Sequence, residues 1–307
     1  MKCVAVFVTD ELYLEITRHA AAVFMINNEN TDVLIYCDGF QPPIDKALGI
    51  AASERGIQFS YHSVPGDART LSLDTHVTKT MLCKFHAINE CLKYYDRVVY
   101  LDGDVLVFGP LPIRTLDFDG HPVAAVYDIA EMGCMTDPRF MENVRENDLS
   151  RHYFNSGVIV ANRVGWNADR FMARYESCIQ SHFERCEYKH DCVTVDQCAF
   201  NVLFRDDWKR LPLSFNMQAC AMFCPGWADA TVRHYVGRRK FLPVRPGRND
   251  SKDLAAINAA RAILRLEPAW LPAADILHEV NRMRHRRSSK RAREVMEELD
   301  SLCCAAP

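Results

Sequence analysis

Continuous apolar runs and apolar helical stripes alternate along the first hundred residues. Residues 3–9 form an uninterrupted apolar run, which is typical of a buried strand, and residues 14–28 place their apolar side chains on one helical stripe. The same patterns predict strands at 31–38 and 57–64, a helix at 45–56, and a helix at 79–94. Apolar strands that alternate with helices indicate a mostly parallel sheet with helices on both faces. We therefore expect an α/β protein.

The rest of the chain continues this pattern and then becomes helical. Strands are predicted at 121–128 and 154–163, and helices at 166–184 and 196–204. Pro243, Pro246 and Gly247 then mark a boundary. We expect a main α/β domain at 1–248 and a C-terminal helical extension at 249–307, with helices at 251–266 and 273–302. Residues 129–150 show no clear period and are expected to form a loop or lid.

Composition narrows the class of protein. The chain has 307 residues, is 49% hydrophobic and carries a formal net charge of −3, so it suits a globular protein with a sizeable core. A nucleic-acid partner is not expected from this charge. The apolar start is too short to span a membrane, and Asp10 and Glu11 follow it at once, unlike a secretion signal. The 13 scattered cysteines favour reduced thiols, and we expect a cytoplasmic location.

Two acidic residues interrupt the apolar segment 97–108. Asp102 and Asp104 lie between two apolar runs, at the expected carboxyl end of a central strand, where open α/β sheets bind their ligands. Paired carboxylates suit Mg²⁺ or Mn²⁺, and such an ion bridges a diphosphate. A solvated acidic turn is the alternative. His234 adds a candidate nitrogen ligand, and the basic group that ends at Lys240 could bind phosphate.

Five ordered motifs widen this picture: "YLDGDVLV", "YFNSGVIVANRVGW", "DQCAFNVLF", "LPLSFN" and "HYVGRRK". Their order and spacing resemble those of glycosyltransferase family 8, over roughly residues 1–245. The resemblance implies a GT-A-type, Rossmann-like fold with a mixed, mostly parallel sheet. It also implies transfer of a hexosyl group, with retention of configuration, from a UDP-sugar to a glycan, lipid-linked or protein acceptor. The implied cofactor is Mn²⁺ or Mg²⁺.

The resemblance assigns roles residue by residue. Asp102, Asp104 and His234 match metal ligands, while Gly237 and Lys240 match the residues that meet the diphosphate. The catalytic residues it implies are Asp128, Asp196 and Gln197, and the further donor-binding residues are Thr9, Asp10, Tyr13, Lys84, Gly103 and Asn155. Tyr13 would stack on uracil, although helix packing is an equal alternative. After Lys240 the chain reads Phe241-Leu242-Pro243, whereas the family commonly has proline and tryptophan, so the resemblance does not extend to the wall of the acceptor-side pocket.

Retention needs either a double displacement or a front-face route in which the leaving phosphate assists the acceptor. The residue matched to the far face of the sugar is Gln197, and an amide is a poor nucleophile. We therefore favour the front-face route, with Asp196 and Gln197 stabilising positive charge on the sugar. Two readings of other classes stay open: a nucleotidyltransferase that makes sugar nucleotides, and a non-catalytic UDP-sugar-binding protein on the same fold.

Two further segments carry competing signals. Cys178, His182, Cys186 and His190 follow one another at four-residue steps, so zinc binding on a helix stands against an ordinary helix face. The basic segment 282–293 is either a solvated helix or a peripheral contact with an anionic membrane.

Overall fold

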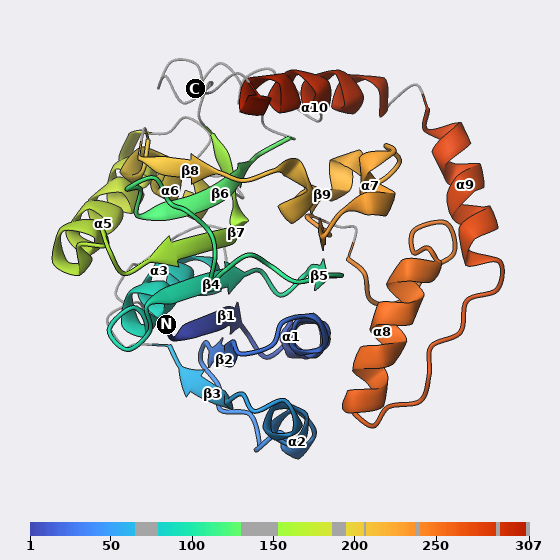
Figure 1. Ribbon diagram of the computed structural model, residues 1–307, viewed down its shortest axis with the longest axis horizontal. Helices are drawn as coiled ribbons and strands as arrows, with labels where there is room; N and C mark the ends of the chain where they lie inside the picture. Colours follow the sequence, from blue (N-terminus) through green and yellow to red (C-terminus); the bar gives the residue numbers. More distant parts are fainter. Residues whose placement is uncertain are drawn as a thin grey trace.

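A seven-stranded sheet forms the centre of the protein (Figure 1). The computed structural model describes residues 1–64, 79–129, 153–185, 195–205, 207–237, 240–286 and 289–304. The strand order is β3-β2-β1-β4-β7-β6-β8, and a second sheet has the order β5-β10-β9. The strands are β1 Cys3–Thr9, β2 Asp32–Cys37, β3 Phe59–Ser63, β4 Arg97–Leu101, β5 Val105–Val107, β6 Val123–Tyr127, β7 Phe154–Asn162, β8 Trp208–Arg210, β9 Met217–Gln218 and β10 Val232–His234.

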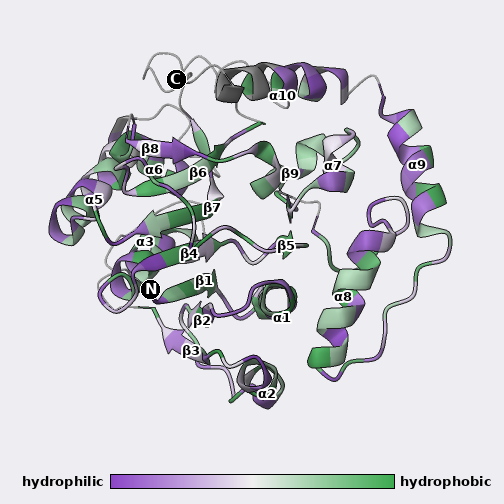
Figure 2. Cartoon of the chain, viewed as in Figure 1, coloured by the Kyte–Doolittle hydropathy of each residue, from purple (hydrophilic) through white to green (hydrophobic). Residues whose placement is uncertain are grey.

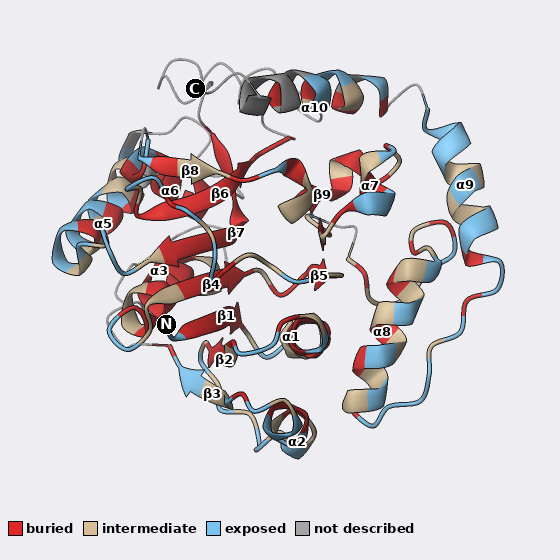
Figure 3. Ribbon diagram, in the orientation of Figure 1, coloured by how far each residue is buried: buried red, intermediate tan, exposed pale blue. Residues whose placement is uncertain are grey.

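The large sheet is mixed but mostly parallel, as the sequence predicts. Strands β3, β2, β1 and β4 run parallel, β7 runs antiparallel to both β4 and β6, and β8 runs parallel to β6. The carboxyl ends of β1, β4 and β6 therefore lie at the same edge as the start of β7. The middle strands are buried (Figure 3), whereas the two edge strands, β3 and β8, are hydrophilic (Figure 2). Polar edge strands resist pairing with other chains.

Helices cover both faces of this sheet. Phe7 of β1 packs edge-on against Phe24 of α1, with ring centroids 6.5 Å apart. Tyr36 of β2, which pairs in register with Val8, contacts Cys91 of α3. Because successive residues of a strand point to opposite faces, α1 and α3 lie on opposite faces. The helices are α1 Leu14–Asn27, α2 Lys46–Glu54, α3 Lys79–Cys91, α5 Ala168–Arg185, α6 Val195–Leu203, α7 Gly226–Asp229, α8 Ser251–Ile263, α9 Ala274–Arg284 and α10 Ser289–Cys304.

The C-terminal helices wrap around the right and upper sides of the sheets in Figure 1. Helix α8 packs against α1. The single helix expected at 273–302 is wrong, because the chain turns at His285 and Arg286 and forms α9 and α10 instead. The basic run at this point offers no apolar stripe to bury, whereas α10 buries Val295 and Leu299. Every helix in the described part of the chain is too short or too polar to cross a membrane. The domain boundary at 248 stays a prediction.

Candidate active site

The acidic turn follows strand β4 at the carboxyl edge of the sheet, as predicted. The Asp102 amide donates to the Gly157 carbonyl at 2.8 Å, and the Tyr100 hydroxyl donates to Oδ1 of Asp102 at 2.7 Å. The Asp102 side chain keeps 29% of its surface exposed, whereas the whole of Asp104 is only 5% exposed. One carboxylate thus faces the solvent side of the turn and the other is buried beneath it.

His234 reaches the same turn from a strand 130 positions later in the sequence. Strand β10 pairs antiparallel with β5, which places His234 opposite Val105, and the Tyr235 amide donates to the Asp104 carbonyl at 3.0 Å. Nε2 of His234 lies 3.3 Å from Oδ1 of Asp104 and 3.6 Å from Oδ2 of Asp102. The two sheets therefore bring the three predicted metal ligands together.

The hydrogen bond of the other ring nitrogen orients the His234 imidazole. Nδ1 lies 3.0 Å from the carbonyl oxygen of the Asn216 side chain, and this contact turns Nε2 toward the carboxylates. The Asn216 amide in turn donates to Oδ1 of Asn155 at 2.9 Å. One ligand atom from each of Asp102, Asp104 and His234 lies within 4.8 Å of the others, so this cluster fits a divalent metal ion.

Two glycines let the backbone approach this cluster. A Cβ on Gly157 would lie 2.1 Å from Cε1 of His234 and 2.8 Å from Oδ2 of Asp102. A Cβ on Gly103 would lie 2.3 Å from Oγ1 of Thr17, at the start of α1. Glycine is therefore required at both positions by close packing rather than by backbone angle.

Lys84 and Lys240 balance part of the negative charge. Nζ of Lys84 lies 2.6 Å from Asp196 and 3.4 Å from Asp102, and the residue is 2% exposed. Burial alone would lower the pKa of Lys84, but these two carboxylates outweigh burial and raise it. Lys240 forms an ion pair with Asp104. Burial would raise the pKa of Asp104, but His234 and Lys240 hold it well below its usual range.

A buried polar network lies beside the acidic turn. Asn155 and Gln197 both donate to Oδ2 of Asp128, at 2.8 and 2.9 Å. The Ser156 amide donates to the Gln197 side chain at 3.0 Å, and the Ser156 hydroxyl donates to Oδ2 of Asp196 at 3.1 Å. Oδ1 of Asp196 is buried and has no hydrogen-bond partner among the described residues. The network thus joins the three predicted catalytic residues and leaves one carboxylate oxygen available.

The first turn of α1 closes the site on another side. The Tyr13 amide donates to Asp10 at 2.8 Å, and the Thr17 hydroxyl donates to the Thr9 hydroxyl at 3.1 Å. Nζ of Lys240 lies 5.1 Å from the centre of the Tyr13 ring, a cation–π distance. Burial, followed by the charge of Asp104, raises the pKa of Tyr13 far above its ordinary value, so the phenol stays neutral.

Gly237 follows β10 and has φ +67°, in the left-handed region where glycine is favoured, and a Cβ there would meet no atom within 4 Å. All the predicted metal, donor and catalytic residues therefore lie in the described part of the chain. Their contacts connect the metal cluster, Lys84, the polar network and α1.

Comparison with known proteins identifies the family. The sequence model described as "Glycosyl transferase family 8" matches residues 4–241. The chain belongs to glycosyltransferase family 8. This confirms the resemblance read from the five motifs, and the matched region ends just before helix α8.

Related family 8 and GT-A proteins share part of the chain or its fold. The glycosyltransferase GlyB of Streptococcus pneumoniae is 31% identical over 150 residues, which cover 48% of this chain and 30% of GlyB. A lipopolysaccharide 1,2-glucosyltransferase of Escherichia coli is 27% identical over 124 residues, 39% of this chain and 34% of that protein. The chain thus matches about a third of the length of these curated relatives.

Solved structures confirm the fold. The apo structure of the bifunctional glycosyltransferase WbbM superposes with a TM-score of 0.64 at 17% identity, covering 92% of this chain and 52% of that one. The galactosyltransferase LgtC, solved with donor and acceptor sugar analogues, gives a TM-score of 0.58 at 19% identity, covering 88% and 98%. At such identities the likeness shows the GT-A fold alone.

Sequence reasoning missed three residues that build the candidate site. Gly157 and Asn216 lie inside the quoted motifs "FNSG" and "LPLSFN", yet no role was predicted for them. A glycine inside an apolar strand does indicate close approach by another group, which was the available signal for Gly157. Tyr100 gave no signal, because a tyrosine in a buried strand reads as core.

Some predictions lie outside the described residues. They include Arg238 and Arg239, most of the loop at 129–150, and the Cys186–His190 part of the candidate zinc helix. Cys178 lies on α5, half-buried as a free thiol, and burial raises its pKa. The described residues therefore test neither zinc binding nor the alternative of an ordinary helix face.

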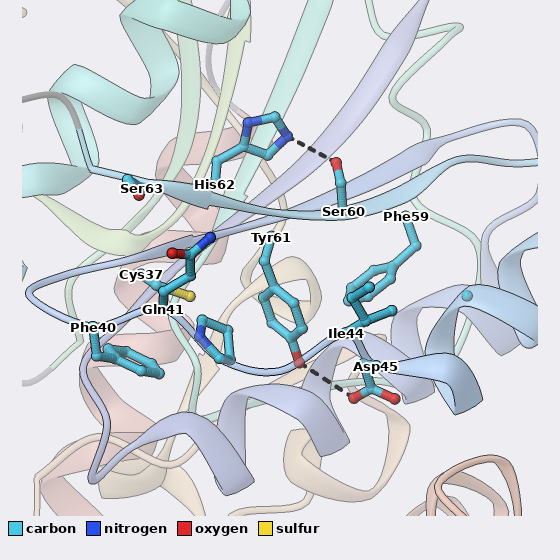
Figure 4. Close-up of a pocket in the computed structure, with 12 residues that line it drawn as sticks. Cys37, Phe40, Gln41, Ile44, Asp45, Phe59, Ser60, Tyr61, His62 and Ser63 are labelled. Carbon is cyan, nitrogen blue, oxygen red and sulfur yellow. Dashed lines mark hydrogen bonds between the residues drawn. The ribbon is translucent and has the colours of Figure 1, made fainter.

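A separate cavity lies beside edge strand β3 (Figure 4). It has a volume of about 320 Å³ and is lined by the rings of Phe40, Phe59 and Tyr61. The Tyr61 hydroxyl points toward Asp45 and donates to it at 3.2 Å. Three strand spacings separate β3 from β4, so this cavity lies roughly 14 Å from the acidic turn. Among the described residues around it there is no metal-ligand cluster, and we assign it no part in the chemistry.

Proposed function

We propose that this protein is a retaining glycosyltransferase that moves a hexosyl group from a UDP-sugar to an acceptor and depends on Mn²⁺. One observation carries the proposal: a single side chain, Lys84, separates the Asp102–Asp104–His234 cluster from the network that contains Asp196 and Gln197. Lys84 joins the two, because it contacts a carboxylate of each. Family membership supports the class of reaction, and galactosyl and glucosyl transfer by the named relatives supports a hexose.

The donor would lie along the carboxyl edge of the large sheet. Thr9 and Asp10 would meet the uridine, and Tyr13 would stack on the uracil ring. Gly103 and Gly237 would let the backbone approach the donor. Lys240, and Lys84 from the opposite side, would bind the diphosphate as positive charges, and Asn155 would line the sugar.

Asp102, Asp104 and His234 would hold the divalent ion. When bound, such an ion neutralises the negative charge that develops on the diphosphate leaving group. The same chemistry does not require a particular ion, but the mixed oxygen and imidazole ligands suit Mn²⁺ better than Mg²⁺, which prefers oxygen alone. The contact of Nδ1 with Asn216 turns Nε2 of His234 toward the carboxylates and supports this choice.

Transfer breaks the bond between the anomeric carbon and the diphosphate oxygen. The acceptor hydroxyl oxygen bonds to the same face of that carbon, and its proton passes to the departing diphosphate. Both ends of the Gln197 amide already have partners, in Asp128 and the Ser156 amide, so this side chain is held and is a poor nucleophile. The unpartnered oxygen of Asp196 would instead stabilise the positive charge of the sugar in the transition state.

We also propose a cytoplasmic protein that contacts an anionic membrane through 282–293, where a lipid-linked acceptor would lie. Arg282, Arg284 and Arg286 are exposed on or just after α9, and Met283 is 60% exposed beside them. Such a combination of cationic and apolar side chains suits a membrane surface. Replacing the three arginines by glutamine should abolish sedimentation of the protein with anionic vesicles. Neutral vesicles are the control, and neither wild type nor the variant should sediment with them. Unchanged sedimentation would reject the contact.

The proposed function is tested by a donor panel. Purified protein is incubated with UDP-hexoses and Mn²⁺, and UDP release is measured with and without EDTA, beside Asp104→Asn. We expect metal-dependent turnover with at least one donor, lost in the variant. NMR of the product then reports the anomeric configuration. Pyrophosphate-dependent formation of a UDP-sugar would instead favour a nucleotidyltransferase, and tight donor binding without turnover a binding protein.

A further inference from the structure

The strand that carries the metal ligand His234 also carries a buried arginine on its other side. In β10, Arg233 and His234 are neighbours, so their side chains point in opposite directions. His234 faces the acidic turn, whereas Arg233 faces helices α7 and α8. Arg233 is 0% exposed, which is rare for a charged side chain.

The sheet around this strand is too small to fix His234 by itself. Strands β5 and β10 have three residues each and β9 has two. Short ribbons of this size are marginally stable without packing from outside. Strand β5 begins directly after Asp104 and pairs with β10. A shift of β10 would therefore move both His234 and Asp104 relative to Asp102.

Arg233 ties this small sheet to the first turn of helix α8. Its guanidinium donates to both carboxylate oxygens of Asp250, at 2.8 and 2.9 Å, and to Asp253 at 2.7 Å. It also donates to the Trp227 carbonyl at 2.9 Å and lies 5.0 Å from the ring centres of both Trp227 and Phe108. A planar fork with this many partners has little freedom left.

Helix capping explains only part of this arrangement. Asp250 accepts from the Asp253 amide at 2.9 Å, and the Asp253 side chain accepts from the Asp250 amide at 3.4 Å, which completes a capping box. A capping box needs neither an arginine nor a tyrosine hydroxyl. Asp253 is 0% exposed and accepts from Arg233 and from the Tyr235 hydroxyl, the two residues on either side of His234. The carboxylate of Asp253 therefore holds β10 on both sides of the metal ligand.

These carboxylates lie outside the part of the chain that matches the family, which ends at residue 241. We propose that Arg233 and Asp253 are positioning residues for His234, so that the C-terminal extension completes the metal site through helix α8. The proposal rests on the metal site of the proposed function. It predicts that changes in α8 alter metal affinity although no residue of α8 touches the ligand cluster.

Manganese binding by the full chain tests the proposal. Calorimetric titration with MnCl₂ without nucleotide, well below the unfolding temperature, compares wild type with Arg233→Gln and Asp253→Asn. We expect binding roughly 10-fold weaker in both variants, the lower end of what outer-shell changes cause, and a smaller loss in Arg233→Lys, which keeps the charge. Asp253→Asn keeps the shape of the side chain and so remains informative if Arg233→Gln fails to fold.

Leu48→Ala is the matched control. Leu48 is fully buried in helix α2, far from the metal ligands Asp102, Asp104 and His234. It should lower the unfolding temperature without changing the Mn²⁺ dissociation constant. Wild-type affinity in folded Arg233→Lys and Asp253→Asn, with only a lower unfolding temperature, would overturn the proposal.

A second readout needs no metal. In NMR spectra of the metal-free protein, the carbon-bound ring protons of His234 are assigned with His234→Asn. Asp253→Asn should move these resonances, whereas Leu48→Ala should leave them in place, and unchanged His234 resonances in Asp253→Asn would count against positioning. If wild type binds no Mn²⁺, the proposed metal site fails, while this spectrum still decides whether Asp253 orients His234.

Discussion

Gly157→Ala perturbs the proposed metal site by a single methyl group. The new Cβ would lie 2.1 Å from Cε1 of His234 and 2.8 Å from Oδ2 of Asp102. An ordinary contact between carbons needs about 3.5 Å, so the imidazole must retreat by roughly 1.4 Å. Metal–ligand distances tolerate about 0.2 Å, so a shift of this size removes His234 from the ligand set.

The expected loss is measurable. Displaced ligand geometry costs about 10–100-fold in metal affinity, or about 1.4–2.7 kcal/mol, and overpacking costs about 1–3 kcal/mol of folding stability. Calorimetry with MnCl₂ measures the first and chemical denaturation the second. Gly49→Ala is the control, because a Cβ at this helical position meets no atom within 4 Å. It should bind Mn²⁺ as wild type does and gain up to about 1 kcal/mol of stability. Folded Gly157→Ala with wild-type affinity would refute the proposed ligand geometry.

Three further predictions concern other buried polar groups. Lys84→Met leaves the buried carboxylate of Asp196 and the partly exposed carboxylate of Asp102 without their cation, and it should lower the free energy of unfolding by about 3–5 kcal/mol. Exposed Lys93→Met should lower it by at most about 1 kcal/mol, and equal losses in urea denaturation would contradict the ion-pair account. Asn216→Ala removes the side chain that Nδ1 of His234 contacts and should weaken Mn²⁺ binding about 10–100-fold, so unchanged affinity would argue against an orienting role of Asn216. Burial lowers the pKa of His19 in the folded protein below its ordinary value of 6.5. As the pH falls, the unfolded chain therefore binds a proton at this residue before the folded chain does, and the folded state loses stability below about pH 6.5. Between about pH 7.5 and 5.5 the unfolding temperature should therefore fall less in His19→Leu than in wild type.

The sequence predicted the sheet and the acidic turn because both depend on local patterns. The run at residues 3–9 became strand β1 with the predicted bounds, and Asp102 follows β4 at the expected edge. The family motif then pointed to His234, which is far from Asp104 in the sequence but lies beside it in the structure. The same reasoning gave one helix at 273–302 where there are two, because helical composition does not show where a chain turns.

The supporting contacts could not be predicted. Asn216 reads as an ordinary polar residue after a strand–turn segment, and only the folded chain places its carbonyl oxygen 3.0 Å from Nδ1 of His234. Arg233 and Asp253 each read as surface charges, since a basic residue in a short strand and an acid in a first helical turn are common. Their burial follows from how α8 packs on the small sheet, which no local pattern encodes.

The location of manganese tests the central claim most directly. Crystals grown with UDP and MnCl₂, measured at the manganese absorption edge, report the position of the ion by anomalous scattering. We predict one peak within roughly 2.5 Å of an oxygen of Asp102, an oxygen of Asp104 and Nε2 of His234. A peak elsewhere, or UDP bound with no peak between these three residues, would contradict the account.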